Sequence, residues 1–286
     1  MTEGRATLAR PLLWAYCSLT LVFLCAPILI VVVVSFNASE FIQFPPQAWS
    51  LRWYRNYFGS AQWVEPTLLS LRIAFVTMVL ATVLGTAAAL GLTRGRFRGR
   101  RALEFFFVSP MVMPTIVLAI GLYLLFARFK LVGQPLALYL AHTVVAAPLV
   151  IVIVSAALKT TDSAIELAAR SLGAGYFRTL WHVTLPAILP SVVSGAAFAF
   201  LLSFDEVVLA IFLGGPATTT LPKRMWESVR YEIDPTLTAI STLLVIIPIV
   251  ILAGVEIVRR SFAGATAPRP AETTRHGGES HRGHDG

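Results

Sequence analysis

The sequence predicts an all-α membrane protein, a bundle of six transmembrane helices with both termini in the cytoplasm. Hydrophobic residues make up 56% of its 286 residues, charged residues only 13%, and the mean hydropathy is +0.74. Soluble domains carry about 25% charged residues. Six apolar stretches can each cross a hydrocarbon core of about 30 Å, which takes about 20 helical residues. Because backbone groups in lipid must satisfy one another, we expect each stretch to be a helix.

The expected spans are joined by two short connections and three longer loops. They cover residues 11–36, 69–93, 105–127, 135–158, 189–213 and 235–258. Proline within a span removes a helix hydrogen bond and permits a kink. Small residues at helical spacing predict close helix contacts. The pairs are Gly85 with Ala89, Ala87 with Gly91, and Gly195 with Ala199.

The distribution of Lys and Arg orients the bundle. If the N-terminus is cytoplasmic, the inner segments hold about twice as many Lys and Arg as the outer ones, as the positive-inside rule requires. Residues 1–10 are then a cytoplasmic N-terminus and residues 11–262 the six-span domain. Residues 263–286, rich in Gly, Pro, Arg and His, are expected to be a disordered cytoplasmic tail. The basic residues are divided among short loops, which does not favour nucleic-acid binding.

The loop at residues 159–187, between the fourth and fifth spans, carries its own helix signals. Asp162 or Ser163 can cap a short helix, and Glu166 lies in its first turn, where the helix dipole favours an anion. Gly173 can adopt the left-handed geometry that ends such a helix. An apolar stripe at helical spacing consists of Ile165, Ala168, Ala169 and Leu172. A second helical run, residues 176–182, is expected to end before Leu185 and Pro186. The alternative is an ordinary amphipathic helix on the bilayer surface.

This layout resembles the cytoplasmic loop motif of ABC importer permeases. The motif reads Glu-Ala-Ala, three residues, Gly, nine residues, Ile, one residue, Leu-Pro. The residues in register are Ala168, Ala169, Gly173, Val183 in place of Ile, Leu185 and Pro186. Leu167 occupies the motif's Glu position, and the acid stands one residue earlier, at Glu166. That shift rotates the carboxylate by about 100° around the helix.

Two acids, Asp205 and Glu206, fall inside the fifth expected span. A charge within a bilayer costs at least about 2.5 kcal/mol, and such residues usually face the bundle interior or a water-filled path. Adjacent residues point about 100° apart, so one acid can face a pathway while the other packs against a neighbour such as Arg72. They could serve a cationic solute or form a structural polar pair.

The region around these acids resembles the polyamine (spermidine/putrescine) branch of the ABC importer permeases. The matching segments are Ser203-Phe-Asp-Glu-Val-Val, Gly214-Gly-Pro, Thr220-Leu-Pro, Met225-Trp-Glu and Asp234-Pro-Thr. Residues 225–231 are expected to form a short helix at the outer membrane surface. Related permeases carry iron, thiamine or phosphonate, so other solutes remain alternatives.

The resemblance implies a permease subunit of the bacterial inner membrane that forms half of a solute pathway. It implies that Glu166, Ala168, Ala169, Gly173, Leu185 and Pro186 couple the chain to a dimer of ATP-binding subunits. It also implies a second permease subunit, usually a different chain, and an extracytoplasmic solute-binding protein. The sequence has no Gly-x-x-x-x-Gly-Lys-Ser/Thr phosphate loop, so ATP and Mg are expected on the partner. We expect no enzymatic activity, metal or cofactor in this chain. A stand-alone secondary transporter or channel that uses the two acids is the competing class.

Overall fold

The structure is a computed structural model that describes residues 3–232 and 234–266. This part of the chain consists of helices and connecting segments, with one isolated bridge between Asn37 and Trp49. The helices are α1 (Glu3–Val34), α2 (Arg52–Gly59), α3 (Ala61–Arg94), α4 (Arg100–Val112), α5 (Thr115–Arg128), α6 (Pro135–Thr160), α7 (Ser163–Ser171), α8 (Tyr176–Thr179), η1 (Leu180–Thr184), α9 (Leu185–Phe204), α10 (Val208–Leu213), η2 (Pro216–Thr218), α11 (Leu221–Tyr231) and α12 (Thr236–Thr266).

Five of the described helices are long and apolar enough to cross a membrane, and a bent pair, α4 with α5, counts as a sixth span. The all-α prediction is confirmed, and most spans lie where they are expected. The second helix begins earlier than predicted, at Ala61, and the last one continues to Thr266. Residues 263–266 are therefore helical, contrary to the expected start of a disordered tail, and the rest of that tail lies outside the described residues.

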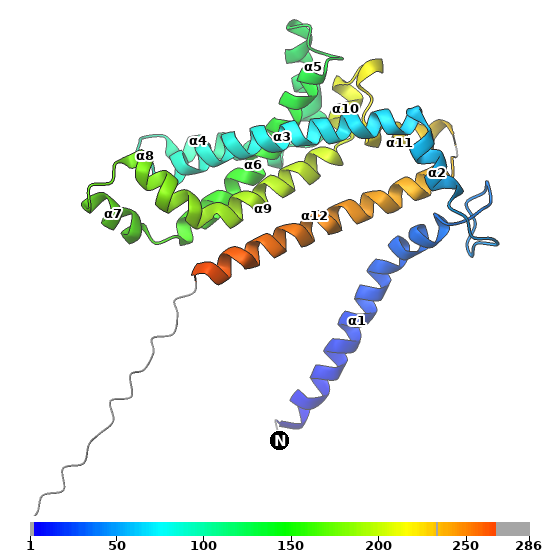
Figure 1. The fold of residues 1–286 in the computed structure, drawn as a ribbon, viewed down its shortest axis with the longest axis horizontal. Helices are drawn as coiled ribbons and strands as arrows, with labels where there is room; N and C mark the ends of the chain where they lie inside the picture. Colours follow the sequence, from blue (N-terminus) through cyan, green and yellow to red (C-terminus); the bar gives the residue numbers. More distant parts are fainter. Residues whose placement is uncertain (1–2, 233, 267–286) are drawn as a thin grey trace, which may run out of the picture.

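The third span is not one straight helix. The axes of α4 and α5 meet at 107°, with Met113 and Pro114 between them. A residue before proline is pushed towards extended backbone, and Met113 has φ −73° and ψ 139°. The helix must therefore stop there and restart at Thr115. Figure 1 shows α5 turning away from the bundle beside α10, against which it packs.

The fifth span differs from the prediction at both ends. The helix begins at Tyr176 rather than residue 189, and it ends at Phe204 rather than residue 213. The run from residue 176 was expected to stop before Leu185 and Pro186, and this is wrong. A π-helical segment, Leu180–Thr184, carries the chain without a break into α9. Since proline lacks an N–H and its ring clashes with the preceding turn, a wider turn before Pro186 lets the helix continue.

The core lies where α3, α6 and α9 pack together (Figure 1). Val150 of α6 is fully buried at this junction. A Cβ atom added at Gly85 would lie 2.8 Å from the Val150 Cβ, and one at Gly195 would lie 3.4 Å from Val150 Cγ1. Two of the three predicted small-residue contacts are therefore confirmed. A Cβ at Gly91 would meet no atom within 4 Å, so the third is wrong.

The two ends of the bundle carry different short helices. Figure 1 shows α7 and α8 at one end, and α2 and α11 at the other. Helix α11 is longer than the expected helix at residues 225–231, because Pro222 fits the first turn of a helix that begins at Leu221. Helix α1 slants away from the bundle and meets it chiefly through α12.

Candidate coupling loop and pathway acids

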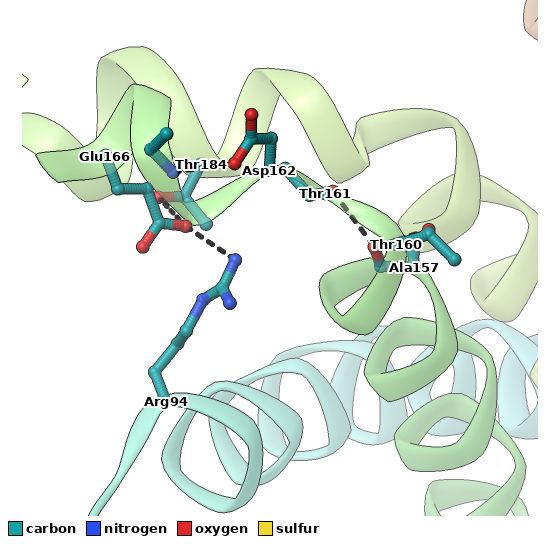
Figure 2. Close-up of polar contacts among 8 residues, drawn as sticks. Arg94, Ala157, Thr160, Thr161, Asp162, Glu166 and Thr184 are labelled. Carbon is teal, nitrogen blue, oxygen red and sulfur yellow. Dashed lines mark hydrogen bonds and ion pairs between the residues drawn. The ribbon is translucent and has the colours of Figure 1, made fainter. Parts of the chain in front are cut away.

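Local signals shape the loop helix α7 as the sequence predicts. The Asp162 carboxylate accepts a hydrogen bond from the Ala164 N–H at 2.8 Å, which confirms Asp162 as the N-cap. Gly173, just past the helix, has φ +90°, the left-handed conformation that a side chain disfavours. The hydroxyls of Thr160 and Thr161 both donate to the Ala157 carbonyl at 2.9 Å, which closes α6 before α7 begins (Figure 2).

The carboxylate of Glu166 joins three parts of the chain. Its Oε1 accepts from Arg94 Nη2 at 2.9 Å and from the Thr184 hydroxyl at 3.1 Å (Figure 2). Arg94 is the last residue of α3, and Thr184 directly precedes α9. The Glu166 side chain is only 10% exposed and that of Arg94 25% exposed. The loop helix is therefore attached to two spans by one largely buried ion pair and one buried hydrogen bond.

Burial of Glu166 leaves the apolar side chains of the loop exposed. Besides Tyr176, whose ring lies against Arg170, five large ones are exposed: Ile165 (57%), Leu167 (66%), Leu172 (90%), Phe177 (74%) and Trp181 (63%). We call these five residues the docking surface. An amphipathic helix usually buries its apolar side, whereas α7 buries its acid. Exposed apolar surface of this kind marks a contact with a protein or a membrane.

The other predicted coupling residues lie near this surface. Ala168 is exposed and Ala169 half-buried in α7, while Leu185 packs against the core cluster of α3, α6 and α9. Pro186 is exposed in the first turn of α9. Because Thr184 precedes Leu185 and binds Glu166, the structure brings these residues together at one end of the bundle.

The two acids lie at the other end of α9, about 30 Å away along a helix of 20 residues. They occupy the break between α9 and α10, where they were expected inside a continuous helix. Glu206 Oε1 accepts from the backbone N–H groups of Val208 at 2.8 Å and Leu209 at 3.1 Å. A carboxylate that bonds to nearby N–H groups competes with helix continuation, and here it caps α10.

Asp205 has a different environment from Glu206. It is exposed, it follows the last residue of α9, and its carboxylate has no hydrogen bond or ion pair within the described chain. The same holds for Arg72, which is exposed and pairs with neither acid. Of the two predicted pathway residues, Glu206 therefore stabilises local structure and Asp205 is the available charge. A buried link fixes the helix end beside them, since the Ser203 hydroxyl lies 2.8 Å from His142 Nδ1 of α6.

Sequence reasoning missed Arg94, Thr184 and His142. In the sequence, Arg94 is one of many basic residues of the inner segments. In the structure it ends the helix α3 and lies beside the loop helix. A buried carboxylate requires a cationic partner, but the burial of Glu166 is known only from the structure. Thr184 and His142 carry no distinguishing pattern in a single sequence.

Comparison with known proteins agrees with this arrangement. Residues 81–269 match the family described as binding-protein-dependent transport system inner membrane component. The putrescine transport system permease protein PotI of Escherichia coli K12 is 39% identical over 229 residues, covering 78% of this chain and 81% of that protein. The spermidine/putrescine transport system permease protein PotC of Haemophilus influenzae is 32% identical over 242 residues, covering 83% and 92%.

The fold also has a close match among solved structures. A bacterial ABC transporter involved in the import of the acidic polysaccharide alginate superposes with a TM-score of 0.70 at 14% identity. The match covers 90% of this chain and 98% of that one. At such low identity the likeness establishes the fold of an ABC importer permease.

The family match spans most of the chain, and the relatives align with it over most of their own length. Membership also decides between the two transporter classes that the sequence left open, since a stand-alone carrier or channel does not work with a binding protein. The chain therefore belongs to the family of binding-protein-dependent transport system inner membrane components, and it is a multi-pass permease subunit of an ABC importer of the inner membrane rather than an enzyme.

Proposed function

We propose that this permease forms half of the pathway for a polyamine such as spermidine or putrescine, driven by ATP hydrolysis on separate subunits. The observation that carries the mechanical part is the attachment of α7 through Glu166 to both Arg94 and Thr184. A displacement of α7 is passed directly to the ends of α3 and α9, because the ion pair is short and largely buried.

The docking surface is the proposed contact with a dimer of ATP-binding subunits, which carry the ATP and Mg. Its exposed apolar side chains would be covered by a groove on that partner. Glu166, Ala168, Ala169 and Gly173 shape α7 for this contact. Leu185 and Pro186 pass the motion into α9, which is continuous with the loop through the π-helical segment Leu180–Thr184. In this proposal the loop and both termini lie in the cytoplasm, as the Lys and Arg distribution favours.

A second permease subunit, a different chain, completes the pathway. Helix α1 supports this arrangement, because its large side chains remain exposed over most of its length; examples are Trp14 (73%), Leu19 (70%) and Phe23 (75%). Lipid or a neighbouring permease must cover them. The opposite end, with α2 and α11, would receive the solute-binding protein, which selects the cargo.

The polyamine assignment is supported by the names of PotI and PotC and by the exposed Asp205 carboxylate. An anion at the α9 break can attract a polycation, because opposite charges near a wet surface attract each other by about 1–4 kcal/mol.

The test of this assignment is ATP-dependent uptake of labelled putrescine and spermidine by the assembled transporter in proteoliposomes. Uptake of iron, thiamine or phosphonate in place of both polyamines would overturn the solute assignment. Normal polyamine uptake by an Asp205→Asn, Glu206→Gln double variant would contradict the proposed attraction between these acids and the polyamine.

A further inference from the structure

A cavity of about 520 Å³ lies between the end of α3 and the loop helix α7. Its lining combines residues from the α3–α4 connection with residues of α7. They are Arg94, Arg96, Ser163, Glu166, Leu167 and Arg170. Three arginines from two segments that are far apart in the sequence therefore line one cavity.

The cavity carries uncompensated positive charge. Glu166 is the one acid in its lining, and it is already paired with Arg94. Arg96 and Arg170 form no ion pair with any described residue, although the guanidinium of Arg170 lies 5.4 Å from the ring centroid of Tyr176. Guanidinium groups present forked donors that suit phosphate oxygens.

Arg94 itself is incompletely satisfied. A guanidinium has five N–H donors, and only Nη2 of Arg94 has an acceptor, the Glu166 carboxylate. Its Nε is buried without a hydrogen-bond partner in the described chain. A buried donor without an acceptor is unusual, and the one hydrogen bond that Arg94 makes leaves guanidinium donors that can bind a further anion. The cavity beside Arg94 therefore favours an anionic ligand.

The position of the cavity indicates where that ligand comes from. Because Arg94 is the last residue of an apolar span, we expect the cavity to lie at the depth of lipid headgroups. Phe97, the residue after Arg96, is 45% exposed, and helix α4, which follows it, exposes Phe105 (81%) and Phe106 (69%). Acyl chains can cover these rings while the guanidinium groups bind the headgroup. An acidic segment of a protein partner would leave the rings uncovered.

We propose that this cavity binds the phosphate of an anionic phospholipid and places it against the loop helix α7. Basic pockets at the cytoplasmic ends of membrane helices suit such headgroups. The bound phosphate, a singly charged diester, offsets part of the positive charge of Arg96 and Arg170 and bridges the α3–α4 connection to α7. This proposal does not depend on which solute the permease carries.

The test measures lipid binding to the full-length chain by native mass spectrometry. Dioleoyl-phosphatidylglycerol is compared with dioleoyl-phosphatidylcholine, and the variants are Arg96→Gln, Arg170→Gln and the control Arg101→Gln. Arg101 lies in the same basic segment and is exposed, but it does not line the cavity. We expect preferential binding of phosphatidylglycerol, a loss of about fivefold in affinity for each cavity variant, and a change of less than about twofold for the control.

Three results would contradict the proposal. Equal losses for all three variants indicate general attraction to an anionic surface and no defined site. Displacement of the lipid by an equal concentration of inorganic phosphate indicates a site for the free anion. Complete loss of bound lipid when the ATP-binding subunits assemble on the chain indicates that the cavity belongs to the protein interface. Retention of the lipid in the assembled transporter, with the variant pattern above, supports the site.

Discussion

Arg94 Nη2 lies 2.9 Å from Glu166 Oε1, and this pair joins the end of one span to the loop helix 72 residues later in the chain. Replacement of either residue by a neutral one is expected to destabilise the protein, because it leaves the other charge buried without its partner. The pair therefore determines how firmly α7 follows the bundle.

Replacement of Arg94 by Gln tests this attachment. We expect the free energy of unfolding to fall by about 1–3 kcal/mol, because the Glu166 carboxylate loses its charged donor. Denaturant titration of the purified chain in detergent measures the change. The matched control is Lys159→Gln, which removes the exposed, 4.0 Å pair with Glu104 and should cost less than about 1 kcal/mol. Equal effects of the two variants would mean that the Arg94 pair has no special role.

Gly173 provides a test of coupling. Its φ of +90° disfavours any side chain by about 1–2 kcal/mol, although a Cβ there would meet no atom within 4 Å. We expect Gly173→Asp to insert into the membrane at normal levels but to lose ATP-driven uptake, because α7 ends in an altered geometry. Gly175→Ala is the control, since that position is equally open but has φ −66°. Wild-type uptake by Gly173→Asp would refute the coupling role.

The two pathway acids should respond differently to substitution. Asp205→Asn removes the exposed charge, and we expect the KM for polyamine uptake to rise about tenfold. Glu206→Gln keeps an oxygen that can accept from Val208 and Leu209 and should transport almost normally, whereas Glu206→Ala loses the cap and about 1 kcal/mol of stability. An equal loss of uptake in Asp205→Asn and Glu206→Gln would contradict these separate roles.

Packing at Gly85 can be tested with a compensating change. Because a Cβ there would lie 2.8 Å from that of Val150, we expect Gly85→Ala to destabilise the bundle by about 1–3 kcal/mol. Val150→Ala in the same chain should recover part of the loss. Gly91→Ala, on the same helix with open space around it, should not destabilise. Thermal unfolding in detergent provides the comparison, and a destabilised Gly91→Ala would place the effect elsewhere.

The long helices could be predicted from sequence because lipid imposes a length and an apolar composition that a single chain displays directly. The roles of Asp162 and Gly173 at the two ends of α7 could also be predicted, since helix capping depends on only a few neighbouring residues. The helix breaks at Pro114 and Asp205 could not be predicted, because proline and acidic residues occur both inside helices and at their ends. Whether a helix breaks at such a residue depends on tertiary packing.

The candidate site could be predicted only where it depends on local sequence. The spacing from Ala168 to Pro186 located the loop, but not the inward direction of Glu166 or its partners Arg94 and Thr184. Those contacts join residues that are distant in the sequence, and a single chain carries no pattern for them. Glu206 was assigned to the pathway from its chemistry alone, whereas its hydrogen bonds to the backbone give it a local structural role.

The most direct test of the account is solute accumulation by the purified chain in proteoliposomes, with and without its proposed partners. We expect no accumulation of putrescine by the chain alone. ATP-dependent accumulation should appear only when the second permease, the ATP-binding subunits and the solute-binding protein are all present. Concentrative uptake by this chain alone would contradict the central claim that its loop helix transmits work done by another subunit.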